Sequence, residues 1–411
     1  MSCQRTPPIS IDNARNLLID SIIPVKEIEV ISLDQTLGRI AGETLVSKID
    51  LPSTQNAAVD GYGVHSDRLS KAPDQAFKIV GISRAGHPFD GVIGEDEAIE
   101  IYTGGVMPVG ADCVAMHEDC SRDGNKLFVS ATLTEGSNMR LAGENLTKGE
   151  TLVTKGQMIT AALIGQLAAS GTTRLSVLRR IRVAILSTGD EIVASGGSAT
   201  SGQIFDANRP MLKALLQHNH IDLIDCGIVP DRMDVLAEAY EQALQDADVV
   251  ISSGGASDGI EDHTQNAMKQ IGAECVFWRL AMKPGRPMAV GRRDKGLIFC
   301  LPGNPVAAFV CTRLLILPLL GRASGGVWQP ALKIAIPSGF VHRKKPGRAE
   351  FLRVVLENND GKQQLLLHGR KGAGVISSLT GADGLVEIPL DNAGVEVGTL
   401  LYFLPFHERG L

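Results

Sequence analysis

The spacing of hydrophobic and polar positions changes several times along this chain, and each change marks a different kind of segment. Residues 179–326 alternate short apolar runs, such as IRVAIL, DVVI and LIFC, with stretches of helical spacing. This alternation predicts a doubly wound, mainly parallel α/β domain. Residues 49–139 instead carry short alternating stretches separated by Gly, Pro and Asp, which predict a β-rich domain.

The flanking segments complete a four-part division. Ser10 precedes apolar residues at helical spacing, which predicts a capped helix that ends before Pro24. Helical spacing returns after residue 160, so we expect 8–48 and 140–178 to form one discontinuous helical and linker domain that carries the β-rich insertion. Residues 327–411 again contain strand-like pieces and predict a C-terminal β domain. The expected fold class is therefore α/β multidomain.

Composition narrows the classes of partner. The 411 residues carry a formal net charge of −6 and are 4% aromatic, which argues against nucleic-acid binding. Seven scattered cysteines without a C-x-x-C pair fit a reduced cytoplasm better than a disulfide framework. No export signal or membrane span is expected, because Arg313 and Pro318 interrupt the longest apolar run.

Three glycine-rich, acid-bearing turns follow apolar strands in the α/β segment: STGDE at 187–191, SSGGASDGIED at 252–262 and LPGNP at 301–305. Open α/β sheets bind ligands at the carboxyl ends of their strands, so the turns predict one composite site. Glycines let main-chain N–H groups approach an anion, and a helix after each turn would favour phosphate. The expected binding residues are Ser187, Gly189, Asp190, Ser253, Gly254, Gly255, Pro302, Gly303 and Asn304.

Charged side chains add detail to this expected oxoanion site. The turns contain the acidic residues Asp190, Glu191, Asp258, Glu261 and Asp262. Carboxylates repel phosphate unless a divalent cation lies between them, and Mg²⁺ fits best. Asp190 could cap the helix expected after its turn instead of contacting a cation. Lys283 and Arg286, in KPGRP, offer fixed positive charges for further phosphate oxygens.

Ordered motifs extend this pattern over nearly the whole chain. They are NAAVDGYGV at 56–64, IYTGGVMPVGAD at 101–112, MRLAGENLTKGE at 139–150, STGDEI at 187–192, QIFDANRPML at 203–212, GIVPDR at 227–232, SGGASDGIEDH at 253–263, LAMKPGRP at 280–287, LPGNPV at 301–306 and the later GRAEFLRV. In this order they resemble the molybdopterin molybdotransferases, the family of bacterial molybdenum-insertion proteins and the gephyrin E domain.

The resemblance implies an enzyme that takes adenylylated molybdopterin and molybdate as substrates and releases AMP with the help of Mg²⁺. It also implies elongated homodimers, in which the insertion of one subunit faces the α/β domain of the other and the active site is shared. Residues 8–48 and 140–178 would then serve dimerisation. Further expected partners are other molybdenum-cofactor biosynthesis proteins and apo-molybdoenzymes.

By the same resemblance, individual residues receive roles. The expected catalytic residues are Asp60, Thr103, Glu191, Asp231 and Asp262. The expected metal contacts are Glu191, Asp231, Asp262 and Asn145. Asn145 stands where the family usually has Asp, which removes a charge. Two alternatives therefore stay open: a non-catalytic molybdopterin carrier or scaffold, and a dinucleotide pyrophosphatase of the wider fold family.

Overall fold

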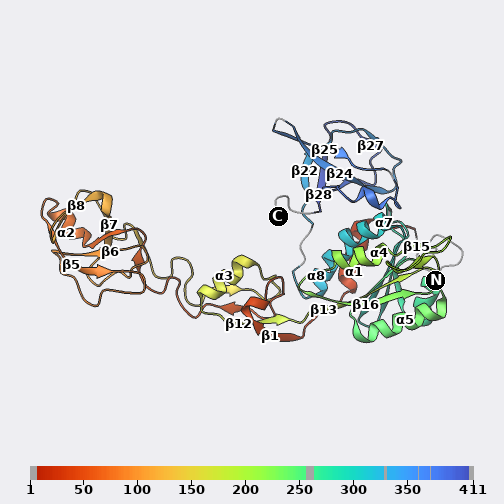
Figure 1. Cartoon of the computed structure of the whole chain (residues 1–411), viewed down its shortest axis with the longest axis horizontal. Coiled ribbons are helices and arrows are strands. Elements are labelled where there is room, and N and C mark those ends of the chain that lie inside the picture. Colours follow the sequence, from red (N-terminus) through yellow and green to blue (C-terminus); the bar gives the residue numbers. More distant parts are fainter. Residues whose placement is uncertain (1–6, 256–262, 328–330, 360, 371, 407–411) are drawn as a thin grey trace.

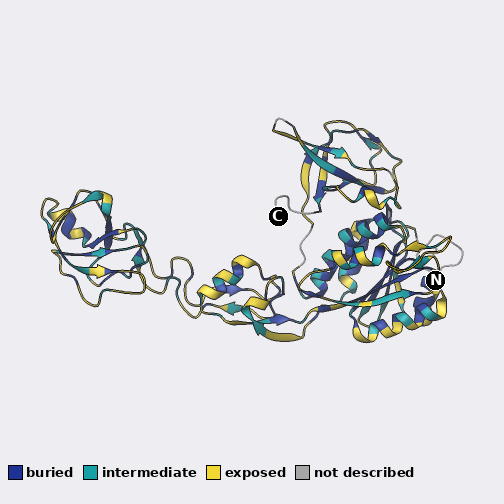
Figure 2. Cartoon of the chain, in the orientation of Figure 1, coloured by how far each residue is buried: buried dark blue, intermediate teal, exposed yellow. Residues whose placement is uncertain are grey.

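The computed structural model describes residues 7–255, 263–327, 331–359, 361–370 and 372–406. Figure 1 shows an elongated chain with the β-rich insertion at one end, and the α/β and C-terminal domains at the other. A narrow arm of short strands and one labelled helix joins the two ends. Buried residues gather separately inside each part (Figure 2). The multidomain α/β prediction is confirmed, whereas the domain bounds stay predictions.

The α/β domain is built on a sheet of six strands. Their order is β16 (Ile221–Val229), β13 (Ile181–Thr188), β17 (Val249–Ser253), β21 (Gly296–Leu301), β20 (Ala289–Arg293) and β18 (Glu274–Phe277). The first four strands pair in parallel, and the last two continue antiparallel. The sequence missed β20, which joins β21 through a turn with a positive φ at Asp294 rather than at a glycine.

Helices cover both faces of this sheet. They are α1 (Ile11–Ser21), α4 (Asn208–Leu215), α7 (Pro305–Cys311) and α8 (Leu317–Ala323) on one face, and α5 (Met233–Asp246) and α6 (His263–Gln270) on the other. Successive strand residues alternate between the two cores: Ile251 of β17 packs with the first group, and Val250 packs with the second. Burial on both faces explains why these strands are continuously apolar.

Helix α1 begins as predicted, because the Ser10 side chain accepts a hydrogen bond from the Asn13 N–H at 3.2 Å. The sequence did not identify the surface that covers its apolar face. Ile11, Ala14 and Leu18 belong to the core of the α/β domain, where α1 contacts α8 and β18. Periodicity reveals an apolar face, but the element that covers that face depends on tertiary structure.

The helical segment Pro305–Ala323 is apolar and long enough to cross a membrane, but 67% of its most apolar window is buried inside the protein. It consists of α7, a π-helical turn at Thr312–Ile316 and α8. Val306, Leu315 and Leu319 contribute to the core of the α/β domain. Packing of this helix against the sheet accounts for its apolar composition.

The arm is less helical than the sequence predicts. In its described residues the one α-helix is α3 (Ala161–Ala169), which Thr160 caps by accepting the Leu163 N–H at 3.3 Å. The rest is mainly two antiparallel ribbons: β1 (Ile28–Ser32) with β12 (Arg174–Leu178), and β2 (Leu45–Val46) with β11 (Thr151–Val153). These strands are short, so their alternation is too brief to stand out in the sequence.

The insertion is a six-stranded sheet with one short helix, α2 (Ser66–Lys71). The strand order is β7 (Cys113–Met116), β4 (Gly61–Val64), β6 (Glu97–Ile101), β5 (Phe77–Ser83), β9 (Lys126–Val129) and β8 (Cys120–Asp123). The chain enters it through β3 (Asn56–Ala57) and leaves through β10 (Met139–Arg140), and these two strands pair. The predicted β-rich character is therefore present.

The C-terminal sheet incorporates a strand from the α/β domain. Its order is β19 (Met282–Lys283), β24 (Ala349–Asn359), β26 (Gly384–Ile388), β28 (Leu400–Pro405) and β22 (Ile334–Pro337), with β25 (Lys362–Leu367) also paired to β24. A small ribbon joins β23 (His342–Arg343) to β27 (Gly394–Val395). The KPGRP turn is thus attached to the last domain through β19.

The cysteines follow the expectation in part. In the part of the chain that the structure describes, five cysteines lie outside any disulfide: Cys113, Cys120, Cys226, Cys300 and Cys311. Burial raises the pKa of the Cys311 thiol to about 12, which makes it inert at neutral pH. Cys275, however, is disulfide-bonded, which the sequence did not predict.

Candidate functional site

The three glycine-rich turns meet at the carboxyl edge of the parallel strands. β13 lies between β16 and β17, so the turns after β13 and β17 flank the point where the strand order reverses. The Gly254 N–H donates to the Leu301 carbonyl at 3.2 Å, and a methyl group on Gly303 would lie 3.8 Å from the Gly254 Cα. Turns distant in sequence therefore form one surface, with Pro302 buried and Gly303 and Asn304 exposed.

Glycine is required where these turns touch. Gly254 has φ +102°, and a Cβ there would collide with the carbonyl oxygen of Thr188. Gly255 has φ +70°, and its Cβ would collide with the Thr264 hydroxyl. Side chains at these positions would separate the β13 and β17 turns, so the absence of Cβ atoms keeps the site closed at its base.

Asn208 joins two of the turns and was missed as a site residue. Its Nδ2 donates to Ser253 Oγ and to the Gly303 carbonyl, both at 2.8 Å. Asn208 is the first residue of α4, but Ala207 holds the cap position and no side-chain cap bond forms. Its place inside the motif QIFDANRPML was the signal that could have identified it.

The carboxylates after β13 differ from one expectation. The short strand β14 (Ile192–Val193) follows Glu191, so no helix is capped by Asp190 and no helix dipole lies behind this turn. Asp190 Oδ1 instead accepts the Asp231 N–H at 3.2 Å, which ties the turn after β16 to the turn after β13. The Glu191 carboxylate folds back over Gly189, where Oε2 lies 2.7 Å from the place a Cβ would occupy.

Asp231, in the turn after β16, is a partly buried carboxylate. Burial raises its pKa, and the nearby Asp190 and Glu191 charges raise it further, while His263 lowers it. Its Oδ1 atom is buried and lacks a hydrogen-bond partner within the described residues. A carboxylate in this state gains from a cation or a donor group.

Several other buried polar atoms in the described part of the chain share that property, and those near Asp231 include Ser187 Oγ, Thr188 Oγ1 and Asn208 Oδ1. With Asp231 Oδ1 they surround the carboxyl ends of β13, β16 and β17. Buried polar atoms in proteins are almost always hydrogen-bonded to protein, water or ligand. Four such atoms at one place indicate that the site receives a polar molecule or ion.

The expected metal ligands are brought together only in part. Among the described residues, no group of three or more His, Cys, Asp or Glu side chains is arranged to hold a metal ion. Asp262 lies outside those residues, as do Asp258 and Glu261. Asn145 lies in the arm, exposed, with its N–H bonded to the Leu51 carbonyl at 2.9 Å. Glu191 and Asp231 thus remain as the neighbouring pair.

The basic turn sits beside the C-terminal domain. Lys283 Nζ lies 3.2 Å from Glu350 Oε1, and Arg286 is half-buried. A cavity of about 150 Å³ is lined from both domains, by Lys283, Pro284, Glu350, Arg353 and neighbouring residues. The Ala373 carbonyl accepts the Val306 N–H at 3.0 Å, next to the third turn. The sequence left this domain without a role, but it borders the site.

Asp60 and Thr103 form a separate cluster on the insertion. Asp60 Oδ1 accepts the Thr103 N–H at 2.8 Å and the Thr103 hydroxyl at 2.7 Å. The Thr103 backbone donor, followed by its hydroxyl, lowers the pKa of Asp60. The insertion lies at the far end of the molecule from the α/β domain (Figure 1). One chain therefore does not bring Asp60 and Thr103 to Glu191.

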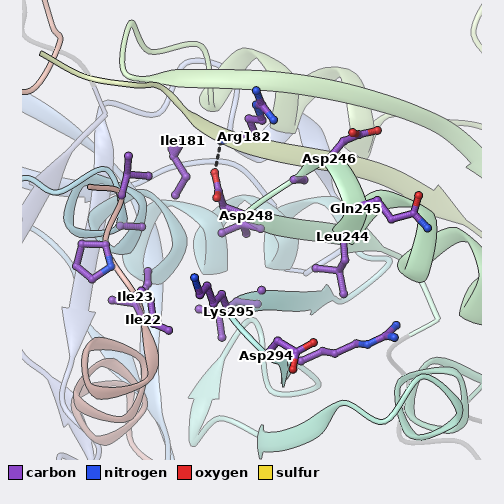
Figure 3. Close-up of a pocket in the computed structure, with 18 of the residues that line it drawn as sticks. Ile22, Ile23, Ile181, Arg182, Leu244, Gln245, Asp246, Asp248, Asp294 and Lys295 are labelled. Carbon is purple, nitrogen blue, oxygen red and sulfur yellow. Dashed lines mark hydrogen bonds between the residues drawn. The ribbon is translucent and has the colours of Figure 1, made fainter. Parts of the chain in front are cut away.

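A larger cavity in the described part of the chain lies elsewhere. It measures about 790 Å³ and opens at the amino ends of β13, β17 and β21, where the arm joins the α/β domain. Figure 3 shows Asp248, Arg182 and Lys295 around it, with Ile22 and Ile23 from the chain that leads into the arm. None of the predicted site residues lines this cavity. The volume of a cavity therefore does not identify the candidate site at the three glycine-rich turns.

Comparisons with known proteins match every part of the chain. Residues 9–171 match the MoeA N-terminal region (domain I and II), 184–322 a probable molybdopterin binding domain, and 337–406 the MoeA C-terminal region (domain IV). The molybdopterin molybdenumtransferase of Haemophilus influenzae is 31% identical, over 97% of this chain and 99% of its own. That of Nostoc sp. is 30% identical, over 96% and 93%. A crystal structure of the molybdopterin biosynthesis MoeA protein from Pyrococcus horikoshii superposes with a TM-score of 0.84 at 26% identity, covering 97% of this chain and 100% of that one.

Proposed function

Because the chain belongs to the molybdopterin molybdenumtransferase family, we propose that it inserts molybdenum from molybdate into adenylylated molybdopterin and releases AMP. It is an enzyme of molybdenum cofactor biosynthesis. We place the reaction in the cytoplasm. This reaction is the one that the geometry of the three turns supports best.

The four unpartnered polar atoms at the strand ends carry the proposal. Ser187 and Thr188 hydroxyls can donate to an oxoanion, and glycine at 189, 254 and 255 lets main-chain N–H groups approach it. Lys283 and Arg286, on the turn at the C-terminal domain, add positive charge for phosphate oxygens. Adenylylated molybdopterin and molybdate are both oxoanionic, so they match this set of donors.

The carboxylates fit a bound Mg²⁺. Asp231 Oδ1 is a buried oxygen without a partner among the described residues, and Asp190 and Glu191 are close enough to raise the Asp231 pKa. Glu191 and Asp231 would hold the ion, with Asp262 as a further ligand. When bound, Mg²⁺ would neutralise charge at the phosphoanhydride that is cleaved. The chain's own groups meanwhile orient the substrate through the hydroxyls and main-chain donors.

The separation of the Asp60 cluster supports a shared site. Thr103 fixes the Asp60 carboxylate through two hydrogen bonds, and the pair is exposed on the insertion. We propose that the chain forms a homodimer in which Asp60 and Thr103 of one subunit face the α/β site of the other. Asp60 would accept a proton or orient water there, and Thr103 would hold it in place.

The test is AMP release from adenylylated molybdopterin by the purified protein, with and without Mg²⁺ and molybdate. Release that needs both ions is the expected result. Tight pterin binding without release would instead establish a carrier, and an Asn145→Asp variant that gained release would trace the loss to that residue. Hydrolysis of a nicotinamide or flavin dinucleotide without any molybdate effect would establish a pyrophosphatase.

A further inference from the structure

The basic turn and the C-terminal sheet are aligned by backbone pairing. β19 runs parallel to β24, with Met282 opposite Ala349 and Lys283 opposite Glu350. Side chains at paired positions lie on the same face of a sheet. Lys283 Nζ accordingly donates to Glu350 Oε1 at 3.2 Å. The lysine thus meets its partner through the register of the two strands.

Glu350 is held from behind by a buried histidine. Its second oxygen, Oε2, lies 2.8 Å from His342 Nε2, and the two residues are only 8% and 7% exposed. Burial raises the pKa of Glu350, but the His342 and Lys283 contacts outweigh it and leave the pKa below its usual value. Each carboxylate oxygen has its own partner, so the carboxylate cannot rotate without losing one of them.

Lys283 itself remains available on its other side. Its side chain is 62% exposed and lines the cavity of about 150 Å³ between the two domains. An ammonium group has three donors, and among the described residues one is used, by Glu350. An exposed ion pair contributes little to stability. Stability alone therefore does not explain a buried carboxylate and histidine placed behind this lysine.

We propose that Glu350, oriented by His342, is a positioning residue that holds the Lys283 ammonium toward the anionic oxygens of the substrate. The C-terminal β domain then completes the substrate-binding site. The identity of that substrate rests on the proposed function. The positioning itself rests on the strand register, the two contacts of Glu350 and the exposure of Lys283.

The experiment compares Glu350→Gln with Glu387→Gln in the full-length protein. Glu387 pairs with Lys333 at 2.9 Å on the same C-terminal sheet, and Lys333 is 42% exposed, so it is a matched lysine–glutamate pair. We measure KM and kcat for adenylylated molybdopterin, and the Kd of inorganic pyrophosphate by titration calorimetry. Glu350→Gln should raise KM and Kd about tenfold, the effect of one well-aligned contact, with kcat within about twofold. Glu387→Gln should leave all three within about twofold of wild type.

A double variant separates positioning from general stability. Lys283→Ala should weaken binding at least as much as Glu350→Gln, and the pair together no more than Lys283→Ala alone, because both remove the same contact. Glu350→Asp should restore part of the affinity. Additive effects, or equal effects of Glu350→Gln and Glu387→Gln, would overturn the inference. Should the wild type release no AMP, the proposed function fails, and the pyrophosphate Kd values alone decide the role of Glu350.

Discussion

At the scale of single residues, the site depends on side chains that are absent and on a polar atom that is left without a contact among the described residues. Gly254 and Gly255 lack a Cβ, which lets two turns touch, and the buried oxygen of Asp231 has no hydrogen-bond partner in the described part of the chain. Asn208 is the opposite case, because one amide nitrogen joins two turns. Such groups lower the stability of the fold or limit which residues are tolerated at a position. They also form the site before the ligand binds.

Asp231→Asn should therefore stabilise the protein and impair its chemistry. The pKa of Asp231 is raised in the folded state, so the folded protein binds this proton more tightly than the unfolded chain does. Ionisation of Asp231 consequently lowers the free energy of unfolding. The free energy of unfolding rises again as pH falls through the folded-state pKa, because Asp231 is then protonated. At neutral pH the variant should unfold at a higher temperature than wild type, and AMP release should fall by at least about tenfold.

Thermal unfolding from pH 3 to 8 and AMP release at neutral pH check this prediction. The difference in Tm should shrink toward zero at acid pH, where Asp231 is protonated in both states. A variant that is less stable than wild type at neutral pH would show that Asp231 is a structural ion-pair partner instead.

At the scale of elements, the junction of arm and sheet is tied by one arginine. Arg179 donates to both oxygens of Asp248 at 2.8 and 2.9 Å, and Asp248 also accepts the Arg182 N–H at 2.8 Å. Burial raises the pKa of Asp248, but these contacts outweigh it and lower the pKa overall. The stabilisation is present above the unfolded-state pKa and is lost as pH falls through the folded-state value.

Asp248→Asn should lower the free energy of unfolding by about 1.5–3 kcal/mol at neutral pH, the usual range for hydrogen bonds to charged groups. Asp234→Asn is the control, because its pair with Arg232 is more than half exposed and should contribute much less to stability. Urea denaturation at pH 7 and at pH 3 measures both. An Asp248 difference that persists unchanged at pH 3 would contradict the electrostatic explanation.

The sequence predicts the elements of this molecule better than their partners. Continuous apolar strands and glycine-rich turns are local signals, so the parallel strands of the α/β sheet and the meeting of its turns were foreseeable, whereas β20 was missed. The packing of α1 on the sheet, the pairing of β19 with β24 and the bridging role of Asn208 join segments distant in sequence. No local pattern encodes which distant segment fills such a place, and the resemblance to a family identified motifs without their contacts.

At the scale of the whole molecule, the two clusters of site residues lie at opposite ends of an elongated chain (Figure 1). A dimer with a shared site predicts complementation. Asp60→Ala and Glu191→Ala homodimers should both be inactive, whereas mixed dimers should regain about half of the wild-type AMP release, because one of two sites receives both intact residues. Co-expression with two affinity tags and tandem purification isolates the mixed dimer for this assay.

Size-exclusion chromatography of each variant supplies the control, since both should elute at the wild-type volume, which in the proposed homodimer is that of two chains. Mixed dimers that stay at the level of either homodimer would place Asp60 and Glu191 in separate sites. Loss of the dimer in one variant would show that the substituted residue stabilises the dimer rather than taking part in the reaction.

Because β3 pairs with β10, the insertion could be excised from the chain at a single place. Asn56 stands opposite Arg140 and Ala57 opposite Met139, so the peptide enters and leaves the insertion at neighbouring points. A short hairpin turn could close that gap, and the excised piece could be moved to another scaffold with its two ends already adjacent. In the proposed dimer, the insertion could thus be exchanged as one unit to change the surface that faces the partner subunit, while the α/β sheet is left as it is.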